Sequence, residues 1–275
     1  LNAEGEITQQ WRLNGAITNA DAQDRWMLTV PVSYPADGTA MTTLRKSAAN
    51  IRLGEYIADA TAGSIARYGL DTPRLVIRLH QAAGTIGAVG TTGSYAATDY
   101  PESTITLVIG EQESDLVDYV LYNGGIYRCS TLLLRGVMNA DWQETITRYP
   151  VLTALGNLAS LSCETADGVD TWVITRTEQV AENNELVTDD EGNQVYDIAL
   201  TKNGEPSDYT AFSAAYNQLM MVTMSGRLPD GWTAADAPHT VWTFTDVDGT
   251  VHTVALIRYD AMHDAVAIDG VALFY

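Results

Sequence analysis

The sequence predicts an α+β fold built from two related units, each a mostly antiparallel meander sheet with a packed helix. Three observations support this class. Short segments of alternating apolar and polar residues are separated by tight-turn signals, apolar residues at helical spacing occur within each half, and the same order of features occurs twice. We expect the first unit over residues 1–138, a junction over 139–156, and a second, degenerate unit over 157–275.

The repeated order is the most informative feature of the chain. In each half a Trp-bearing strand comes first, followed by a polar helix start, an amphipathic helix, a Pro that opens an apolar strand, and a tight turn before a Tyr-containing strand. The matching features are Trp26 and Trp172, residues 34–37 and 206–209, Pro73 and Pro238, and residues 123–127 and 269–275. A duplicated scaffold explains a fold but supplies no chemistry.

The first unit is expected to contain two helices and several strands. Met41, Leu44, Ala48 and Ile51 have helical spacing, which predicts a helix laid on a sheet over about residues 38–51. A shorter helix is expected over 61–67, ended by Gly69 in the left-handed conformation. Strands are expected near 73–80, 103–110, 117–123 and 126–129, with Asn123-Gly124 forming a type I′ hairpin turn.

Two connecting segments follow from composition. Residues 81–103 are rich in Gly, Ala and Thr, including Gly84, Gly87, Gly90 and Gly93, and are expected to form a long mobile loop or a loosely formed hairpin. In the junction, Asp141 is expected to begin a short helix that ends before Tyr149-Pro150, because the residue before proline avoids the helical region.

The second unit is expected to be a longer meander around one helix. Ser207 or Asp208 is expected to cap that helix, and Phe212, Tyr216 and Leu219 give it an apolar face. One face of each sheet is expected to be solvated and the other covered by the helix. Strands are expected at 158–165, 171–179, 195–202, 239–246, 251–259, 264–268 and 271–275, with an acidic hairpin whose tip is 190–193 and hairpin turns at Asp248-Gly249 and Asp269-Gly270.

The charge balance excludes some functions. With 15 Lys and Arg against 35 Asp and Glu, the net charge is −20. Such a surface repels phosphate backbones and anionic lipid, so nucleic-acid binding and direct docking on a membrane are not expected, whereas basic partner proteins remain compatible. No apolar stretch is long enough to span a bilayer. The chain begins Leu1-Asn2, so we expect any signal or membrane anchor to lie upstream.

The sequence assigns no catalytic, metal-binding or cofactor-binding residue. Cys129 and Cys163 form no CxxC motif; they are expected to be buried free thiols or, alternatively, a disulfide between the two halves. A metal site formed by His239 and His252 with Asp246 or Asp264 is weighed against half-exposed strand histidines, which we favour. Residues 246–249 resemble the start of a calcium loop but lack its later acidic ligands, so a hairpin is expected there.

Several phrases together resemble the bacterial domain-of-unknown-function family numbered 4340. They are Tyr34-Pro35-Ala36-Asp37, residues 68–73 (YGLDTP), residues 106–111 (TLVIGE), Tyr119-Val120 and Gly125-Ile126-Tyr127. The YGLD.P and L.IG phrases are the clearest marks, and the resemblance covers about residues 26–129. The second half is similar to a degenerate copy that keeps Trp172, Pro238 and Gly270 but lacks both phrases.

The resemblance implies a location and partners rather than a reaction. Proteins of this family typically lie outside the cytoplasmic membrane behind an N-terminal membrane segment and are often associated with ABC-transporter components related to those of gliding motility. It implies no catalytic residues. We therefore expect a non-enzymatic extracytoplasmic interaction module, tethered to the membrane by a segment absent from this chain, with protein partners in the cell envelope.

The expected contact surface is formed by the cleft between the two halves and the 81–103 segment, together with aromatic residues in loops and at the junction. These residues are Tyr95, Tyr100, Trp142, Tyr149 and Trp232. The alternative is that they fill gaps between the halves. A glycan- or peptide-binding module that uses an aromatic cleft is the alternative function, and a hydrolase built, for example, on His252 and Asp264 is the second alternative.

Overall fold

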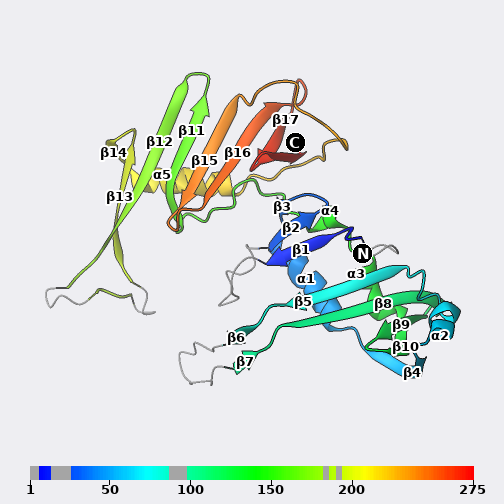
Figure 1. Ribbon diagram of the computed structural model, residues 1–275. Helices are drawn as coiled ribbons and strands as arrows, with labels where there is room; N and C mark the ends of the chain where they lie inside the picture. The colour runs from blue at the N-terminus through cyan, green and yellow to red at the C-terminus, as the bar shows by residue number, and fades with distance from the viewer. Residues whose placement is uncertain (1–5, 14–25, 87–97, 182–185, 190–193) are drawn as a thin grey trace. The chain divides into compact units, whose positions relative to one another are not determined.

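A computed structural model describes residues 6–13, 26–86, 98–181, 186–189 and 194–275 (Figure 1). Helices and antiparallel sheets are both present, so the predicted α+β class is confirmed. The chain divides into two compact units, residues 1–147 and 148–275, and the division falls inside the expected junction. In the described part of the chain, no helix is both long enough and apolar enough to cross a bilayer.

The first unit begins with a small antiparallel sheet and a helix. Asp37 caps the helix by accepting a hydrogen bond from the Ala40 amide at 2.7 Å, and Trp11 donates to the Thr145 hydroxyl at 2.8 Å. The sheet contains strands β1 (Gln10–Leu13), β2 (Trp26–Val30) and β3 (Tyr34–Pro35), and the helices are α1 (Gly38–Ala49) and α4 (Trp142–Thr145). Strand β1 has no counterpart among the expected strands.

A five-stranded sheet forms the body of the first unit, in the order β4-β10-β9-β8-β5. Its strands are β4 (Leu53–Asp59), β5 (Leu75–Gln81), β8 (Ser103–Ser114), β9 (Val117–Tyr122) and β10 (Gly125–Ser130), and helix α2 (Ala62–Arg67) lies between β4 and β5 in sequence. Four of these strands were expected. Strand β4, which pairs with β10 at the edge, was not.

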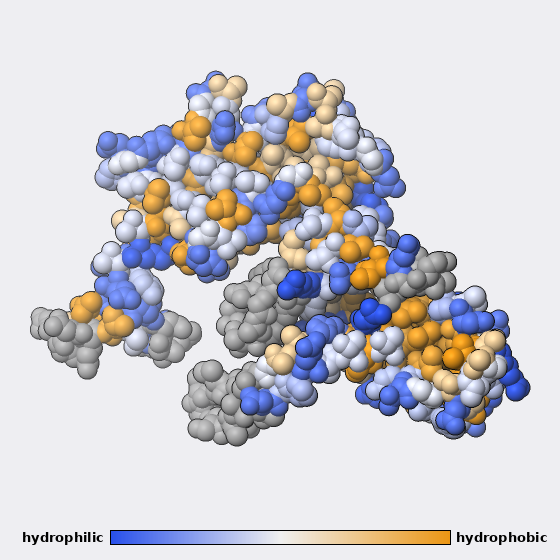
Figure 2. Space-filling model, in the orientation of Figure 1, coloured by the Kyte–Doolittle hydropathy of each residue, from blue (hydrophilic) through white to orange (hydrophobic). Residues whose placement is uncertain are grey.

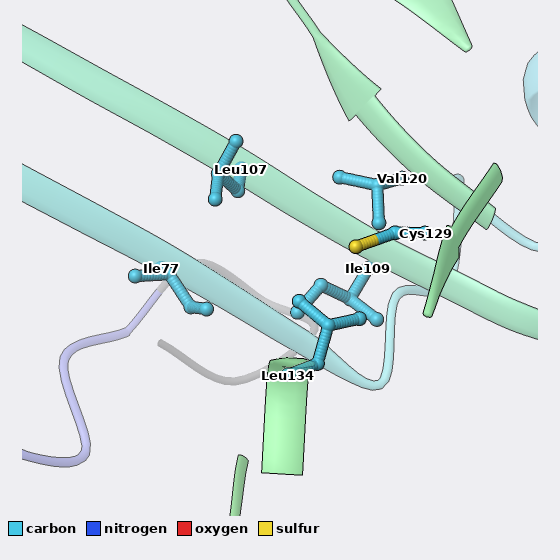
Figure 3. Close-up of a cluster of buried hydrophobic side chains, with 6 residues drawn as sticks. All are labelled: Ile77, Leu107, Ile109, Val120, Cys129 and Leu134. Carbon is cyan, nitrogen blue, oxygen red and sulfur yellow. The ribbon is translucent and has the colours of Figure 1, made fainter. Parts of the chain in front are cut away.

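Helix α3 (Thr131–Met138), which the sequence did not lead us to expect, covers one face of this sheet. Its Leu134 is fully buried with Ile77, Ile109, Val120 and Cys129, whose side chains point toward one another from β5, β8, β9 and β10 (Figure 3). Helix α1, the expected covering helix, packs against α3 and α4. The core under the sheet is therefore closed by the helix that directly follows its last meander strand.

The 81–103 segment forms a hairpin where it is described. Strand β6 (Gly84–Ile86) pairs with β7 (Thr98–Tyr100) in antiparallel register, continuing the direction of β5 and β8 (Figure 1). This agrees with the hairpin alternative. Residues 87–97 lie outside the described part of the chain.

The second unit is one eight-stranded antiparallel sheet crossed on one face by helix α5 (Tyr209–Met220) (Figure 1). Asp208, one of the two expected caps, accepts hydrogen bonds from the Thr210 and Ala211 amides. The strand order is β14-β13-β12-β11-β15-β16-β17-β18. The strands are β11 (Leu158–Thr165), β12 (Gly168–Glu178), β13 (Tyr196–Lys202), β14 (Glu205–Ser207), β15 (Thr240–Asp246), β16 (Val251–Arg258), β17 (Asp264–Ile268) and β18 (Val271–Phe274).

The expectation that one sheet face is solvated is wrong at the β16–β18 end. Ile257, Ala265 and Ala267 point away from α5 yet are buried, because Leu228 and Trp232 pack over them. The segment that carries Leu228 also pairs with β18 through backbone hydrogen bonds. The segment between α5 and β15, residues 221–239, thus closes both a face and an edge of the sheet.

The hairpin turns follow the dihedral prediction with one exception. Asn123 and Gly124 have φ of 46° and 80°, and Asp269 and Gly270 have 49° and 83°, as type I′ turns require. Asn203-Gly204, which was not among the expected turns, forms a third such turn between β13 and β14. At Asp248-Gly249 only Gly249 has positive φ, and the Gly249 amide donates to the Asp246 carbonyl, so this loop is longer than a two-residue turn.

The expected acidic hairpin is present as an extension of β12 and β13. At the far end of this extension, Val187 lies between the two strands. The Val187 amide donates to the Gln179 carbonyl, and the Val187 carbonyl accepts from the Val195 amide. Bridges between Val180 and Leu186 and between Thr188 and Gln194 flank this point. The end of the extension is therefore forked, and the expected tip, 190–193, lies outside the described residues.

Candidate binding groove in the second unit

An open groove of about 340 Å³ lies between α5 and strands β11, β12 and β15 of the second unit. Its lining is mostly apolar and aromatic. The lining residues are Leu161, Cys163, Trp172, Ser207, Asp208, Ala211, Phe212, Ala215, Tyr216, Leu219 and Trp242. A concave site with apolar walls and a few polar groups is the usual form of a ligand site.

Strand alternation explains why these side chains meet. Leu161 and Cys163 are two residues apart on β11 and therefore share a face. Leu161 lies opposite Trp172 of β12, and Cys163 lies opposite Trp242 of β15, so all four side chains project toward α5. The helix contributes residues at spacings of three and four, which form one of its faces.

Aromatic rings form a continuous row from the groove into the core. The ring centroids of Trp172 and Phe212 are 6.1 Å apart, those of Phe212 and Tyr216 are 5.8 Å apart, and those of Tyr216 and Phe244 are 6.3 Å apart. The buried Tyr216 hydroxyl donates to the Thr153 carbonyl at 2.8 Å, and burial raises the pKa of Tyr216 well above its ordinary value. This row fixes the groove floor in one arrangement.

The rim beside Trp172 is polar and held by ion pairing. The Lys202 ammonium lies 5.0 Å from the Trp172 ring centroid and 2.8 Å from the Asp170 carboxylate. Hydrogen bonds from Lys202 and Asn203 lower the pKa of Asp170. Asp208, at the start of α5, adds a second carboxylate to the groove. The second unit as a whole carries five Lys and Arg against nineteen Asp and Glu, a net charge of −14 of the total −20.

The aromatic residues expected to form the contact surface do not line this groove. Tyr100 is half-buried in β7, and Trp142 begins α4, which Figure 1 draws away from the β6–β7 hairpin. Tyr149 is exposed, and Trp232 packs edge-on against Tyr259. Tyr95 lies outside the described residues. Trp172, Phe212 and Tyr216 were noted in the sequence only as strand and helix residues, because the groove depends on which strands neighbour α5.

The histidines considered as alternative metal or hydrolase residues pair with different carboxylates. His239 Nε2 is 3.2 Å from Asp264 Oδ1, whereas His252 Nδ1 is 3.0 Å from Asp269 Oδ2. In the strand register, His252 of β16 lies opposite Phe244 of β15, and the His239 amide donates to the Leu256 carbonyl. His239 precedes Phe244 by five residues, so the two histidines are roughly 17 Å apart along the sheet. The pairing of His252 with Asp264 considered from the sequence is wrong, and no cluster of three potential metal ligands occurs among the described residues.

Both cysteines are free, and their surroundings differ. Cys129 is buried in the core of the first unit, where burial and the charge of Asp118 raise the pKa of its thiol. Cys163 is partly exposed and lines the groove. The expectation of a buried thiol is right for Cys129 and wrong for Cys163, and the alternative disulfide is absent.

The two clearest family phrases pack against each other in the first unit. Gly69 has φ of 63°, and the carbonyl of Tyr68 accepts a hydrogen bond from the Glu111 amide at 3.0 Å. A Cβ atom at Gly110 would lie 2.3 Å from the Tyr68 carbonyl oxygen and 3.0 Å from Leu70, so only glycine fits there. Leu70 is itself buried. The YGLD.P and L.IG phrases therefore form a packing contact. This contact accounts for both phrases by their structural role.

Comparison with known proteins supports the resemblance noted from the sequence. The family model described as "Domain of unknown function (DUF4340)" matches residues 26–239. This match continues beyond the first unit and includes the groove-forming helix and strands β11 to β14. No curated protein and no solved structure matches the chain significantly.

Proposed function

Because the chain belongs to the domain-of-unknown-function family 4340, we propose that it is a non-enzymatic interaction module of the cell envelope. In this proposal the module lies outside the cytoplasmic membrane, held there by a segment outside this chain. Its partners are envelope proteins, and ABC-transporter components are the first candidates. The location and these partners rest on what the resemblance implies.

The aromatic groove of the second unit is the observation that supports a binding function. Its volume of about 340 Å³ is near the lower end of the range for ligand sites, roughly 300–1,000 Å³. It suits one or two large side chains better than a bulky cofactor. Trp172 and Trp242 offer the large apolar contact area on which partner anchors typically depend.

We infer that the occupant is a partner segment with an aromatic or aliphatic anchor flanked by Lys or Arg. The apolar walls select the anchor, and the carboxylates of Asp170 and Asp208 with the net charge of −14 select the basic flanks. A glycan fits less well, because a sugar stacks on a free ring face and the Lys202 ammonium covers a face of Trp172. The separate pairing of the histidines gives the hydrolase alternative no support.

Site-specific crosslinking in native envelopes tests this function. A benzophenone amino acid is placed at Ser207 on the groove rim of the full-length protein, and crosslinked partners are identified by mass spectrometry. Ala215→Trp fills the groove from α5, whereas Ala214→Trp adds the same side chain beside it on an exposed helix position that does not line the groove.

We expect a discrete crosslinked partner in the parent protein and in the Ala214→Trp variant, and its loss in the Ala215→Trp variant. Thermal unfolding of both variants checks that each remains folded. Crosslinks that are identical in all three proteins would contradict the groove as the binding site.

A further inference from the structure

The extension of β12 and β13, which we call the arm, is a two-stranded ribbon. Strand β11 pairs with β12 only as far as Val173, and β14 pairs with β13 only from Leu200 onward. Over residues 175–178 and 196–199 the two strands therefore pair with each other, and in the described part of the chain no third strand joins them. Figure 1 shows the arm projecting from the sheet. An isolated two-stranded ribbon is marginally stable in water.

The outer edge of β13 in the arm offers unpaired backbone groups. The Gln179 amide donates to the Val195 carbonyl, and the Asn203 amide donates to the Thr171 carbonyl, so odd-numbered residues of β13 face β12. Because the bonding direction alternates along an antiparallel strand, Tyr196 and Ile198 direct their N–H and C=O groups to the opposite edge. Beyond the reach of β14, that edge can accept another strand.

Exposed apolar side chains accompany this edge. Tyr196 and Ile198 share one face of the ribbon and are 41% and 42% exposed. Val180 and Leu186, which bridge each other at the fork, are 53% and 51% exposed. Figure 2 shows hydrophobic and hydrophilic residues side by side near the end of the arm. Water-facing side chains of this size supply the apolar contact that a docked segment needs.

The charge of the arm selects the kind of partner. Residues 175–199 contain seven Asp and Glu and one basic residue, Arg176, whose guanidinium donates to the Leu155 and Leu158 carbonyls. Glu178 lies opposite Tyr196, and Asp197 lies between Tyr196 and Ile198. A second copy of this chain would bring the same charge to the edge and would be repelled. Charged residues on natural sheet edges prevent edge-to-edge pairing in the same way. An incoming strand with Lys or Arg would be attracted.

We propose that the outer edge of β13 in the arm accepts an extended, Lys- or Arg-bearing segment of a partner protein as an added strand. Backbone hydrogen bonds to Tyr196 and Ile198 give the register, and alternate apolar side chains of the segment cover the exposed residues. This surface is distinct from the groove and does not depend on the function proposed for it.

A defined peptide tests strand addition. The probe is an eight-residue peptide alternating lysine and valine, and the controls are the same peptide with alternate backbone amides N-methylated and a peptide alternating glutamate and valine. Binding to the full 275-residue chain is measured by fluorescence anisotropy at low and high salt. We expect the N-methylated and glutamate peptides to bind at least tenfold more weakly than the probe. We also expect high salt to weaken the binding of the probe.

Two variants at one residue separate the backbone from the side chain. Ile198→Pro removes the outward N–H and leaves the ladder to β12 intact, whereas Ile198→Ala keeps the N–H and shortens the side chain. We expect about a tenfold loss of peptide affinity for Ile198→Pro and a two- to threefold loss for Ile198→Ala, with unchanged unfolding midpoints. Equal binding of the N-methylated peptide, or equal effects of the two variants, would overturn the proposal. So would concentration-dependent dimerisation abolished by Ile198→Pro, which would identify a second copy as the occupant.

Discussion

Replacement of Arg74 by methionine should strongly destabilise the first unit. Arg74 donates to the Gly110 carbonyl at 2.7 Å and forms an ion pair with Asp118, whose side chain is fully buried. The second carboxylate oxygen of Asp118 has no hydrogen-bond partner among the described residues. Removing one partner of a buried pair costs about 3–5 kcal/mol because the other charge remains desolvated. Since Arg74 is 35% exposed, water can partly replace it, and we expect about 3 kcal/mol.

Thiol labelling in urea measures this loss within the first unit. With Cys163 replaced by serine, only Cys129 can react, and Cys129 belongs to the core that Asp118 adjoins. At a urea dependence of about 2 kcal/mol per molar, the midpoint of Cys129 exposure should fall by about 1.5 M in the Arg74→Met variant. Adding Asp118→Leu should recover most of the loss, because no buried charge is then left unpaired. An unchanged midpoint in the single variant, or a double variant no more stable than it, would refute this account of the pair.

Three further predictions concern individual residues. A small thiol reagent should modify Cys163 rapidly and Cys129 only on unfolding, because burial raises the pKa of the Cys129 thiol; equal rates would contradict this. Gly110→Ala should cost about 1–3 kcal/mol in urea unfolding, since its Cβ would lie 2.3 Å from the Tyr68 carbonyl oxygen; wild-type stability would show that the contact adjusts freely. In an alkaline titration followed at 295 nm, Tyr216 should resist ionisation because burial raises its pKa. Its contribution to stability is complete below the ordinary tyrosine pKa of about 10 and declines as pH rises above it, and full ionisation without unfolding would refute this.

Local chemistry made much of the fold predictable. Asn123-Gly124 and Asp269-Gly270 specify their turns because both central residues must adopt positive φ. The helix over 209–220 was expected from one apolar face and a capping Asp208. Such signals act within a few residues, so the sequence carries them directly.

Elements that depend on tertiary contacts could not be predicted in the same way. Helix α3 has an apolar eight-residue sequence compatible with helix or strand, and its N-cap Ser130 makes no side-chain hydrogen bond. Strand β4 is mostly exposed and is stabilised by pairing with β10, which is distant in sequence. Both are determined by the sheet they join.

The candidate groove shows the same limit. The sequence indicated that Cys163 lies on one face of a strand and that Phe212 and Tyr216 share a helix face. It did not indicate that β11 has β12 on one side and β15 on the other, which brings Trp172 and Trp242 to the same helix. The aromatic residues in loops, which seemed better placed for binding, are not among the residues that line the groove.

Protection of Cys163 tests the central claim, that the groove of the second unit binds a partner segment, most directly. The rate of Cys163 modification is measured in native envelopes and after partners are stripped with high salt, in the parent protein and in the Ala215→Trp and Ala214→Trp variants. We predict slow modification in envelopes that becomes fast after stripping in the parent and Ala214→Trp proteins, and no change on stripping in Ala215→Trp. Equal rates before and after stripping in the parent protein would contradict the claim.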